Sequence, residues 1–234
     1  MGEESVKLIG SWFSPFSFRV KCGLDLKGIE YDFLLEDLMK KSRPLLEEYN
    51  PVYNKQNHKI PVFVHRGKSI IESMVILEYI EETWPDLYPL LPKDEYEKSI
   101  ARFWIKFIED KTATFFKFFL TSGEECKKAQ GEISEILKTI ETQSAIKDDN
   151  CKFFGGDKIN GVDLAFAALA YWLGGMEKVA GVTLLEAHTF PKVHAWTEAF
   201  KKDPVIAKNL PNYEELLVFF ENAKKYGYLQ TPPK

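Results

Sequence analysis

Two serines stand where this chain could do chemistry, in the segment Ser14-Pro15-Phe16-Ser17. The segment lies between an apolar run at 6–9, which is typical of a buried strand, and a helix-like run at 19–27. A Cys-x-x-Cys pair at such a position would exchange disulfides, because a helix N-terminus stabilises a thiolate. Serine at both positions excludes that reaction here. The N-terminus of the following helix would still favour a thiolate at this position. Because the chain itself offers no sulfur there, the thiolate would have to belong to a bound ligand.

The elements that must position this segment follow from aromatic and branched runs. Strands are predicted at 31–35, 60–64 and 68–71, and a helix is predicted to open at Glu72. With a helix between the second and third strands, the element order becomes βαβαββα. This order predicts an α/β fold of the thioredoxin-like type for the N-terminal part.

The same region contains short segments that recur in one known family. In the first domain they are 12–20 (WFSPFSFRV), 27–31 (KGIEY), 36–38 (EDL), 41–42 (KS), 50–52 (NPV), 59–62 (KIPV), 71–73 (IES) and 78–84 (EYIEETW). In the second domain they are 101–104 (ARFW), 154–156 (FGG) and 161–163 (GVD). Taken in this order over nearly the whole chain, they resemble the tau class of plant glutathione transferases. The resemblance implies the cytosolic glutathione transferase fold.

A proline-rich stretch after Trp84 marks a domain break. We therefore expect a thioredoxin-like glutathione-binding domain at 1–85, a linker at 86–92 and an all-helical electrophile-binding domain at 93–234. Helical patterns in the second domain cover 101–119, 132–146, 164–178, 193–201 and 213–225. Asn160 and Asp163 form a predicted capping box at the start of the most apolar of these helices, and its expected role is folding.

Composition excludes several classes of function. The net charge is −4 with the basic residues scattered, which predicts no nucleic-acid binding. No run approaches the ~20 apolar residues that span a bilayer, and the acidic N-terminus lacks the apolar core of a secretory signal. We therefore expect a cytoplasmic protein with no membrane partner. Three widely spaced cysteines and four histidines without ligand spacing predict no metal site.

The resemblance implies a reaction as well as a fold. The thiolate of glutathione would attack a hydrophobic electrophile, or a peroxide, with glutathione as co-substrate and no cofactor. Ser14 matches the catalytic serine of the family, and its hydroxyl can stabilise a thiolate without taking its proton. Ser17 is the local competitor, and we expect it instead to N-cap the first helix. Arg19 could add positive potential near the sulfur or could serve as a structural ion-pair partner.

Further residues would hold the peptide part of glutathione. Ile60 precedes Pro61 at a junction that resembles the family's cis-proline, where exposed backbone pairs with the cysteinyl unit. Glu72 can hold the amine, and Ser73 with the helix N-terminus can hold a carboxylate. The basic candidates for the glycine carboxylate are Lys41 and Lys59.

A polar segment at 53–58 departs from the family pattern by a few extra residues. Its composition predicts a loop that bulges outward. Because it adjoins the glycine-carboxylate end of the site, Lys55 or His58 could replace Lys59 there.

An apolar electrophile pocket is expected between the two domains. Helix position and the resemblance supply its candidates, which are Phe16 (also a glutathione-binding candidate), Leu38, Phe107, Phe115 and Trp172. The resemblance also implies a homodimer. The alternative function is a non-catalytic carrier (ligandin) of hydrophobic metabolites. A thiol transferase would need a cysteine at position 14 and is disfavoured.

Overall fold

A computed structural model describes residues 5–37, 42, 59–148 and 150–226. The chain forms two compact units, and the division between them falls between Leu90 and Leu91. It therefore lies within the segment 86–92 that the sequence suggests as a linker.

The first unit is built on a four-stranded sheet, ordered β2-β1-β3-β4. Its strands are β1 (Val6–Gly10), β2 (Asp32–Leu35), β3 (Val62–His65) and β4 (Lys68–Ile71). Strand β1 pairs with β2 in parallel and with β3 antiparallel, and β3 and β4 are antiparallel. All four strands fall where the sequence predicts them, and the thioredoxin-like fold class is confirmed.

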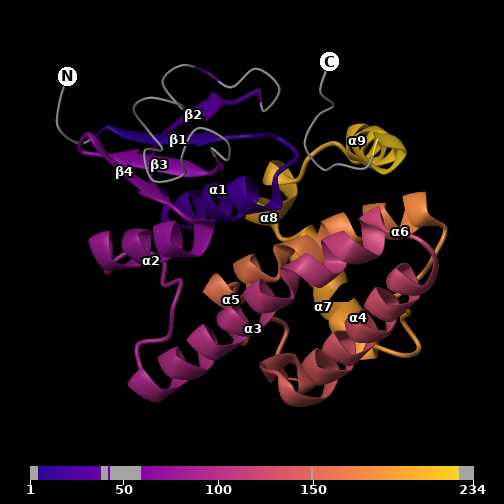
Figure 1. Cartoon of the computed structure of the whole chain (residues 1–234). Helices are drawn as coiled ribbons and strands as arrows, with labels where there is room; N and C mark the ends of the chain where they lie inside the picture. The colour runs from indigo at the N-terminus through magenta and orange to yellow at the C-terminus, as the bar shows by residue number, and fades with distance from the viewer. Residues whose placement is uncertain (1–4, 38–41, 43–58, 149, 227–234) are drawn as a thin grey trace. The chain divides into compact units, whose positions relative to one another are not determined.

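Two helices pack together on one face of this sheet, α1 (Pro15–Lys27) and α2 (Ser73–Thr83) (Figure 1). Helix α1 begins four residues before the predicted run, because Pro15 occupies its first position, where the fixed φ of proline fits a helix and no amide hydrogen is required. The helix is terminated by Gly28, the residue that follows Lys27. Its φ of 67° is the left-handed conformation in which helices commonly end. The predicted helix between the second and third strands falls on 38–58, mostly outside the described residues.

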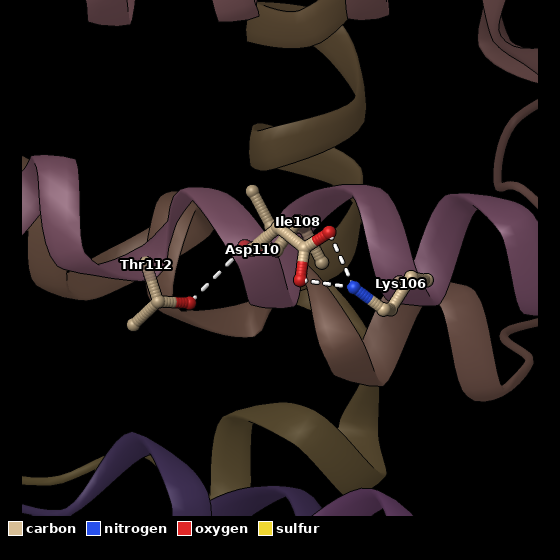
Figure 2. A network of polar contacts seen from close by, with 4 residues as sticks. All are labelled: Lys106, Ile108, Asp110 and Thr112. Carbon is tan, nitrogen blue, oxygen red and sulfur yellow. Dashed lines mark hydrogen bonds and ion pairs between the residues drawn. The ribbon is translucent and has the colours of Figure 1, made fainter.

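The second unit is helical throughout its described elements. Its long antiparallel pair is α3 (Glu95–Leu120) and α4 (Gly123–Gln143), followed by a short 3₁₀ turn. The remaining helices are α5 (Gly161–Ala165), α6 (Leu173–Ala180), α7 (Pro191–Lys202), α8 (Pro204–Asn209) and α9 (Tyr213–Tyr226). On the outer side of α3, Lys106 forms an exposed ion pair with Asp110, and Thr112 donates to the carbonyl of Ile108 at 3.1 Å (Figure 2).

The apolar segment at 164–178 is not the single helix that its composition predicts. A π-helical turn at Ala168–Trp172 separates α5 from α6. Such a turn inserts one extra residue into the helical repeat and shifts the faces of the residues that follow. The helix therefore presents two different faces to the elements packed around it.

The capping box at the start of α5 forms as predicted. The Asn160 side chain accepts from the Val162 and Asp163 amides, and Asp163 accepts from the Asn160 amide at 2.8 Å. Asp163 is fully buried and also accepts from the Phe154 amide at 3.0 Å and the Trp196 indole at 2.8 Å. Burial outweighs these hydrogen bonds and raises the pKa of Asp163 to about 6.

Candidate functional site

The sheet register brings four distant parts of the chain to one edge of the first unit. Ile9 pairs with Leu34 and with Val62, and Val62 pairs with Ile71, so one row of residues crosses all four strands. The chain leaves β1 after this row toward Ser14, enters β3 before it through 60–61, and leaves β4 after it at 72–73. The predicted glutathione-site residues of these three segments therefore leave the sheet at the same edge.

Ser14 is the N-cap of α1. Its backbone is extended, with φ −81° and ψ 118°, and its hydroxyl oxygen accepts a hydrogen bond from the Ser17 amide at 3.2 Å. Among the described residues the Ser14 hydroxyl accepts this bond and donates none. The side chain is 6% exposed. Its oxygen is therefore anchored, while its proton remains available to an acceptor at the helix N-terminus.

Ser17 does not cap the helix, so the prediction for this residue is wrong. It lies inside the first turn of α1, because the cap precedes Pro15 rather than following it. Its hydroxyl accepts from the Ser11 amide at 3.2 Å and is 0% exposed. A Cβ at Gly10 would approach this hydroxyl to 2.7 Å, so the close packing requires glycine there. Ser17 therefore fixes the turn between β1 and α1.

Arg19 projects from α1 toward the start of α2. Its Nη1 donates to the Ser73 hydroxyl oxygen at 3.2 Å, and its guanidinium lies 5.0 Å from the centre of the Phe16 ring. The side chain is 1% exposed. The guanidinium therefore lies beside the first residue of α2. Its two alternative roles, positive potential near the sulfur or a structural ion pair, both stay predictions.

The junction before β3 has the predicted conformation. The Ile60–Pro61 peptide bond is cis. Pro61 is buried, and Ile60 packs against Ile9 and Val62 in the sheet core. Lys59, just before the junction, is exposed.

Glu72 connects β4 to α2 in a conformation that is rare for a residue with a side chain. Its φ is 68° and its ψ is 115°, outside the usual left-handed region, and the side chain is exposed without capping the helix. Such strain costs about 1–3 kcal/mol and is concentrated at functional sites. Ser73 follows as the first residue of α2 and is 4% exposed.

Glu36 directly follows β2 and is buried. In the sequence analysis it is named only as part of the family segment 36–38 and is assigned no role. Its amide donates to the Gly10 carbonyl at 2.7 Å, and its carboxylate accepts from both the amide and the hydroxyl of Ser42, the latter at 2.9 Å. These bonds fix Ser42 beside the sheet edge. Lys41 and Leu38, which were predicted for the site, lie outside the described residues.

Comparison with known proteins assigns both halves of the chain. Residues 4–82 match the family described as "Glutathione S-transferase, N-terminal domain", and residues 103–204 match "Glutathione S-transferase, C-terminal domain". The chain belongs to the glutathione S-transferase family. This is the family that the sequence segments predict.

Relatives over nearly the full length come from plants. A "Probable glutathione S-transferase" of Nicotiana tabacum is 42% identical over 215 residues, 92% of each chain. Glutathione S-transferase U8 of Arabidopsis thaliana is 42% identical over 216 residues, 92% of this chain and 93% of the relative.

Solved structures agree. A tau-class glutathione S-transferase from mango is 34% identical with a TM-score of 0.80, covering 92% of this chain and 96% of that one. Rice GST1 (OsGSTU1), solved in complex with glutathione, is 31% identical with a TM-score of 0.83, covering 96% and 98%. The predicted likeness to tau-class enzymes is confirmed, and the protein is a glutathione S-transferase, an enzyme that conjugates glutathione with electrophiles.

The transferase's helical unit carries the remaining predicted pocket residues. Phe107 and Phe115 on α3 are half-buried, whereas Trp172 is 2% exposed and packs inside the unit. Phe16, in the first unit, is half-buried beneath the Arg19 guanidinium. A pocket lined by these residues stays a prediction.

The described residues of the transferase offer neither a metal site nor a membrane-spanning helix. They contain no cluster of three or more His, Cys, Asp or Glu that could hold a metal ion. Their helices include none that is both long and apolar enough to cross a membrane.

Proposed function

We propose that the Ser14 hydroxyl donates a hydrogen bond to the glutathione sulfur and thereby holds it as the attacking thiolate. The observation that supports this role is the one-sided bonding of Ser14 at the N-terminus of α1. Its oxygen is fixed by the Ser17 amide, and among described residues its proton has no acceptor. Ser17 is the poorer candidate, because its hydroxyl is fully buried and bonded to Ser11.

Conjugation at neutral pH requires that the pKa of the glutathione thiol be lowered. A free thiol has a pKa near ~8.5, so only a few per cent is ionised at neutral pH. A hydroxyl donor and a helix N-terminus both favour the anion, and neither removes the proton itself. The thiolate then forms a bond to an electrophilic carbon and displaces its leaving group. With a peroxide it would attack one oxygen and break the O–O bond, which releases an alcohol after protonation and leaves glutathione as its sulfenic acid.

The remaining groups predicted for the glutathione site would bind the peptide part of glutathione. Glu72 would hold the glutamyl amine, while Ser73 and the amides at the start of α2 would hold the adjacent carboxylate. The backbone of Ile60 would pair with the cysteinyl unit. Lys59, with Lys41, would bind the glycine carboxylate. The strained backbone of Glu72 supports its role, because the conformation costs stability without capping the helix.

The electrophile would bind against aromatic side chains on the helical unit. Phe107 and Phe115 are half-buried and so can contact a ligand, and Phe16, in the first unit, is half-buried and can contact glutathione. Trp172 is 2% exposed and packs inside the unit, so it offers a ligand little contact.

The decisive experiment compares Ser14→Ala with Ser17→Ala. In Ser14→Ala, kcat for conjugation of a chloronitrobenzene should fall about 10²-fold, the scale for losing one anion-stabilising donor. Calorimetric glutathione affinity should stay near wild type, and the ultraviolet absorbance of bound thiolate should disappear at neutral pH. Wild-type turnover in Ser14→Ala would refute the assignment. Thiolate loss in Ser17→Ala at unchanged melting temperature would transfer the role to Ser17.

We also propose that the enzyme is a homodimer. Helix α3 has an apolar stripe at helical spacing, formed by Tyr96, Ile100 and Phe103, which are 69%, 37% and 57% exposed. Exposed apolar stripes of this kind are typical of protein interfaces. Light scattering should give twice the chain mass for the wild type and a smaller mass for Phe103→Glu. A monomeric wild type at micromolar concentration would contradict the proposal.

A further inference from the structure

The side chain of Glu36 connects the sheet of the first unit to a residue outside it. The Glu36 amide donates to the Gly10 carbonyl at 2.7 Å, one step beyond the last pair of β1 and β2, which is Gly10 with Leu35. The backbone of Glu36 is therefore held by the sheet. From this fixed place its carboxylate accepts from both the amide and the hydroxyl of Ser42, the latter at 2.9 Å.

The two ends of this contact differ in burial. Glu36 is 5% exposed, whereas Ser42 is exposed. Burying a carboxylate costs free energy unless hydrogen bonds replace its water, and bonds to a charged acceptor are the stronger kind. Within the described part of the chain, both bonds that the Glu36 carboxylate accepts come from Ser42. The buried charge therefore serves to fix one exposed residue.

The contact closes the loop 37–41, in which two residues predicted for the site lie. They are Leu38 and Lys41, both outside the described residues, and Lys41 directly precedes Ser42 in the sequence. The Ser42 amide belongs to the peptide group that joins it to Lys41, and a peptide group is planar. A bond that orients this amide therefore restricts the backbone from which the Lys41 side chain leaves.

We propose that Glu36 is a positioning residue for glutathione, which acts through the Lys41–Ser42 peptide group. Its carboxylate would hold this group so that the Lys41 ammonium is directed to the glycine carboxylate. A ligand binds more weakly when binding must also order the loop that contacts it, and Glu36 removes that cost in advance. This role of Glu36 rests on the proposed role of Lys41 in the glutathione site.

Charge and positioning predict opposite effects when Glu36 is changed to glutamine. Glutathione is an anion at neutral pH, so a nearby carboxylate repels it, and Glu36→Gln would lower the KM for glutathione if charge alone mattered. If Glu36 orders the Lys41–Ser42 peptide group, the KM should rise. One neutral amide oxygen then replaces two charged oxygens as acceptor for the two Ser42 donors.

The first experiment is steady-state conjugation of a chloronitrobenzene at varied glutathione. Glu36→Gln should raise the KM for glutathione about fivefold, the scale of one hydrogen bond, and should leave kcat within about twofold of wild type. Ser42→Ala loses only the hydroxyl bond and should raise the KM about twofold. Ser42→Thr keeps both donors and should restore the wild-type value. An unchanged or lower KM in Glu36→Gln would overturn the proposal.

The second experiment locates the effect at the glycine end of glutathione. In glutathione monoethyl ester the glycine carboxylate is an uncharged ester, so Lys41 has no anion to pair with. The KM for this ester should be nearly the same in wild type, Glu36→Gln and Lys41→Ala. With glutathione itself each single variant should raise the KM, and the double variant should raise it no further than Lys41→Ala alone. Equal losses for glutathione and its ester in Glu36→Gln would overturn the positioning role.

The matched control is Glu177→Gln in the helical unit. The Glu177 carboxylate likewise accepts from two backbone amides, those of Leu184 and Leu185. Its change to glutamine should lower the melting temperature as Glu36→Gln does, yet keep the wild-type KM for glutathione. A KM that rises as much in Glu177→Gln would show a general loosening of the fold and would overturn the proposal.

The Lys41→Ala variant separates a failure of this role from a failure of the proposed glutathione site. If Lys41→Ala raises the KM for glutathione and Glu36→Gln does not, Lys41 binds the substrate and Glu36 has no positioning role. If Lys41→Ala keeps the wild-type KM, the role of Lys41 is refuted and the role of Glu36 is refuted with it. Neither result touches the assignment of Ser14, which its own variants test.

Discussion

Arg19 and Ser73 link the N-termini of the two helices that cover the sheet. The guanidinium Nη1 donates to the Ser73 hydroxyl oxygen at 3.2 Å, across 54 positions of sequence. Both residues are almost fully buried. Because Ser73 is the first residue of α2 and Ser14 caps α1, this bond sets how the two helix starts lie together.

Arg19→Lys should impair glutathione binding more than turnover. Lysine keeps the charge but loses the planar contact with Phe16 and the directed bond to Ser73. We expect the KM for glutathione to rise about tenfold, which corresponds to ~1.5 kcal/mol for a charged hydrogen bond. The measurement is steady-state kinetics at varied glutathione, with Arg66→Lys as the exposed-arginine control. A lower melting temperature with unchanged KM would assign Arg19 to folding alone.

Glu72→Gly should change stability and binding in opposite directions. Glycine relieves the positive φ of 68°, so the free energy of unfolding should rise by up to about 1 kcal/mol. Glutathione affinity should fall by roughly 1.5–3 kcal/mol, because the carboxylate that holds the amine is lost. Urea unfolding and calorimetry measure the two effects.

The control for this change is Arg66→Gly in the turn between β3 and β4. Arg66 also has a positive φ, 51°, but it takes no part in the proposed site. It should gain similar stability and keep wild-type glutathione affinity. If Glu72→Gly binds glutathione as well as Arg66→Gly does, Glu72 has no role in binding.

Much of the first unit was predictable because its signals are local. Aromatic and branched residues predict the strands. The cis bond before Pro61 has no such local signal, and its prediction came from the family resemblance of the segment 59–62. The sequence predicts the start of α1 four residues too late, because Pro15 is typical of a turn, although proline also favours the first helical position. As a result, the sequence predicts Ser17 as the N-cap of α1, whereas Ser14 occupies that position.

Features that depend on packing had no such signal. The bond from Arg19 to Ser73 joins residues that no pattern relates, and only the sheet register brings them together. The π-helical turn before α6 contains neither proline nor glycine, so nothing local marks it.

Lys59→Ala should raise the KM for glutathione several-fold, because it removes the positive charge that directly precedes the cis junction in the sequence. Lys55→Ala and His58→Ala should have no effect if the segment 53–58 bulges outward, since loop length costs little free energy. Those two residues lie outside the described structure. Comparing the three KM values decides the matter, and an effect at Lys55 or His58 with a silent Lys59→Ala would show that the extra residues reorganise the site.

Asp163 makes folding of the helical unit depend on pH. Its folded pKa of about 6 lies above the usual 3.8, so the folded state holds this proton more tightly than the unfolded chain does. Its contribution to stability is complete below about pH 4 and is lost as the pH rises through 6. The loss across this window is up to about 3 kcal/mol, from 1.36 kcal/mol per pKa unit.

Asp163→Asn isolates this effect because asparagine does not titrate. The variant should be less stable by about 2–4 kcal/mol at low pH, since its amide NH₂ faces amide and indole donors that the carboxyl oxygens now accept. The difference in unfolding free energy between wild type and variant should shrink from pH 4 to 6 and stay constant above. Urea unfolding at five pH values measures it, with the exposed Asp157→Asn as control. A difference that grows with pH would mean that Asp163 is ionised in the folded protein, with its hydrogen bonds outweighing its burial.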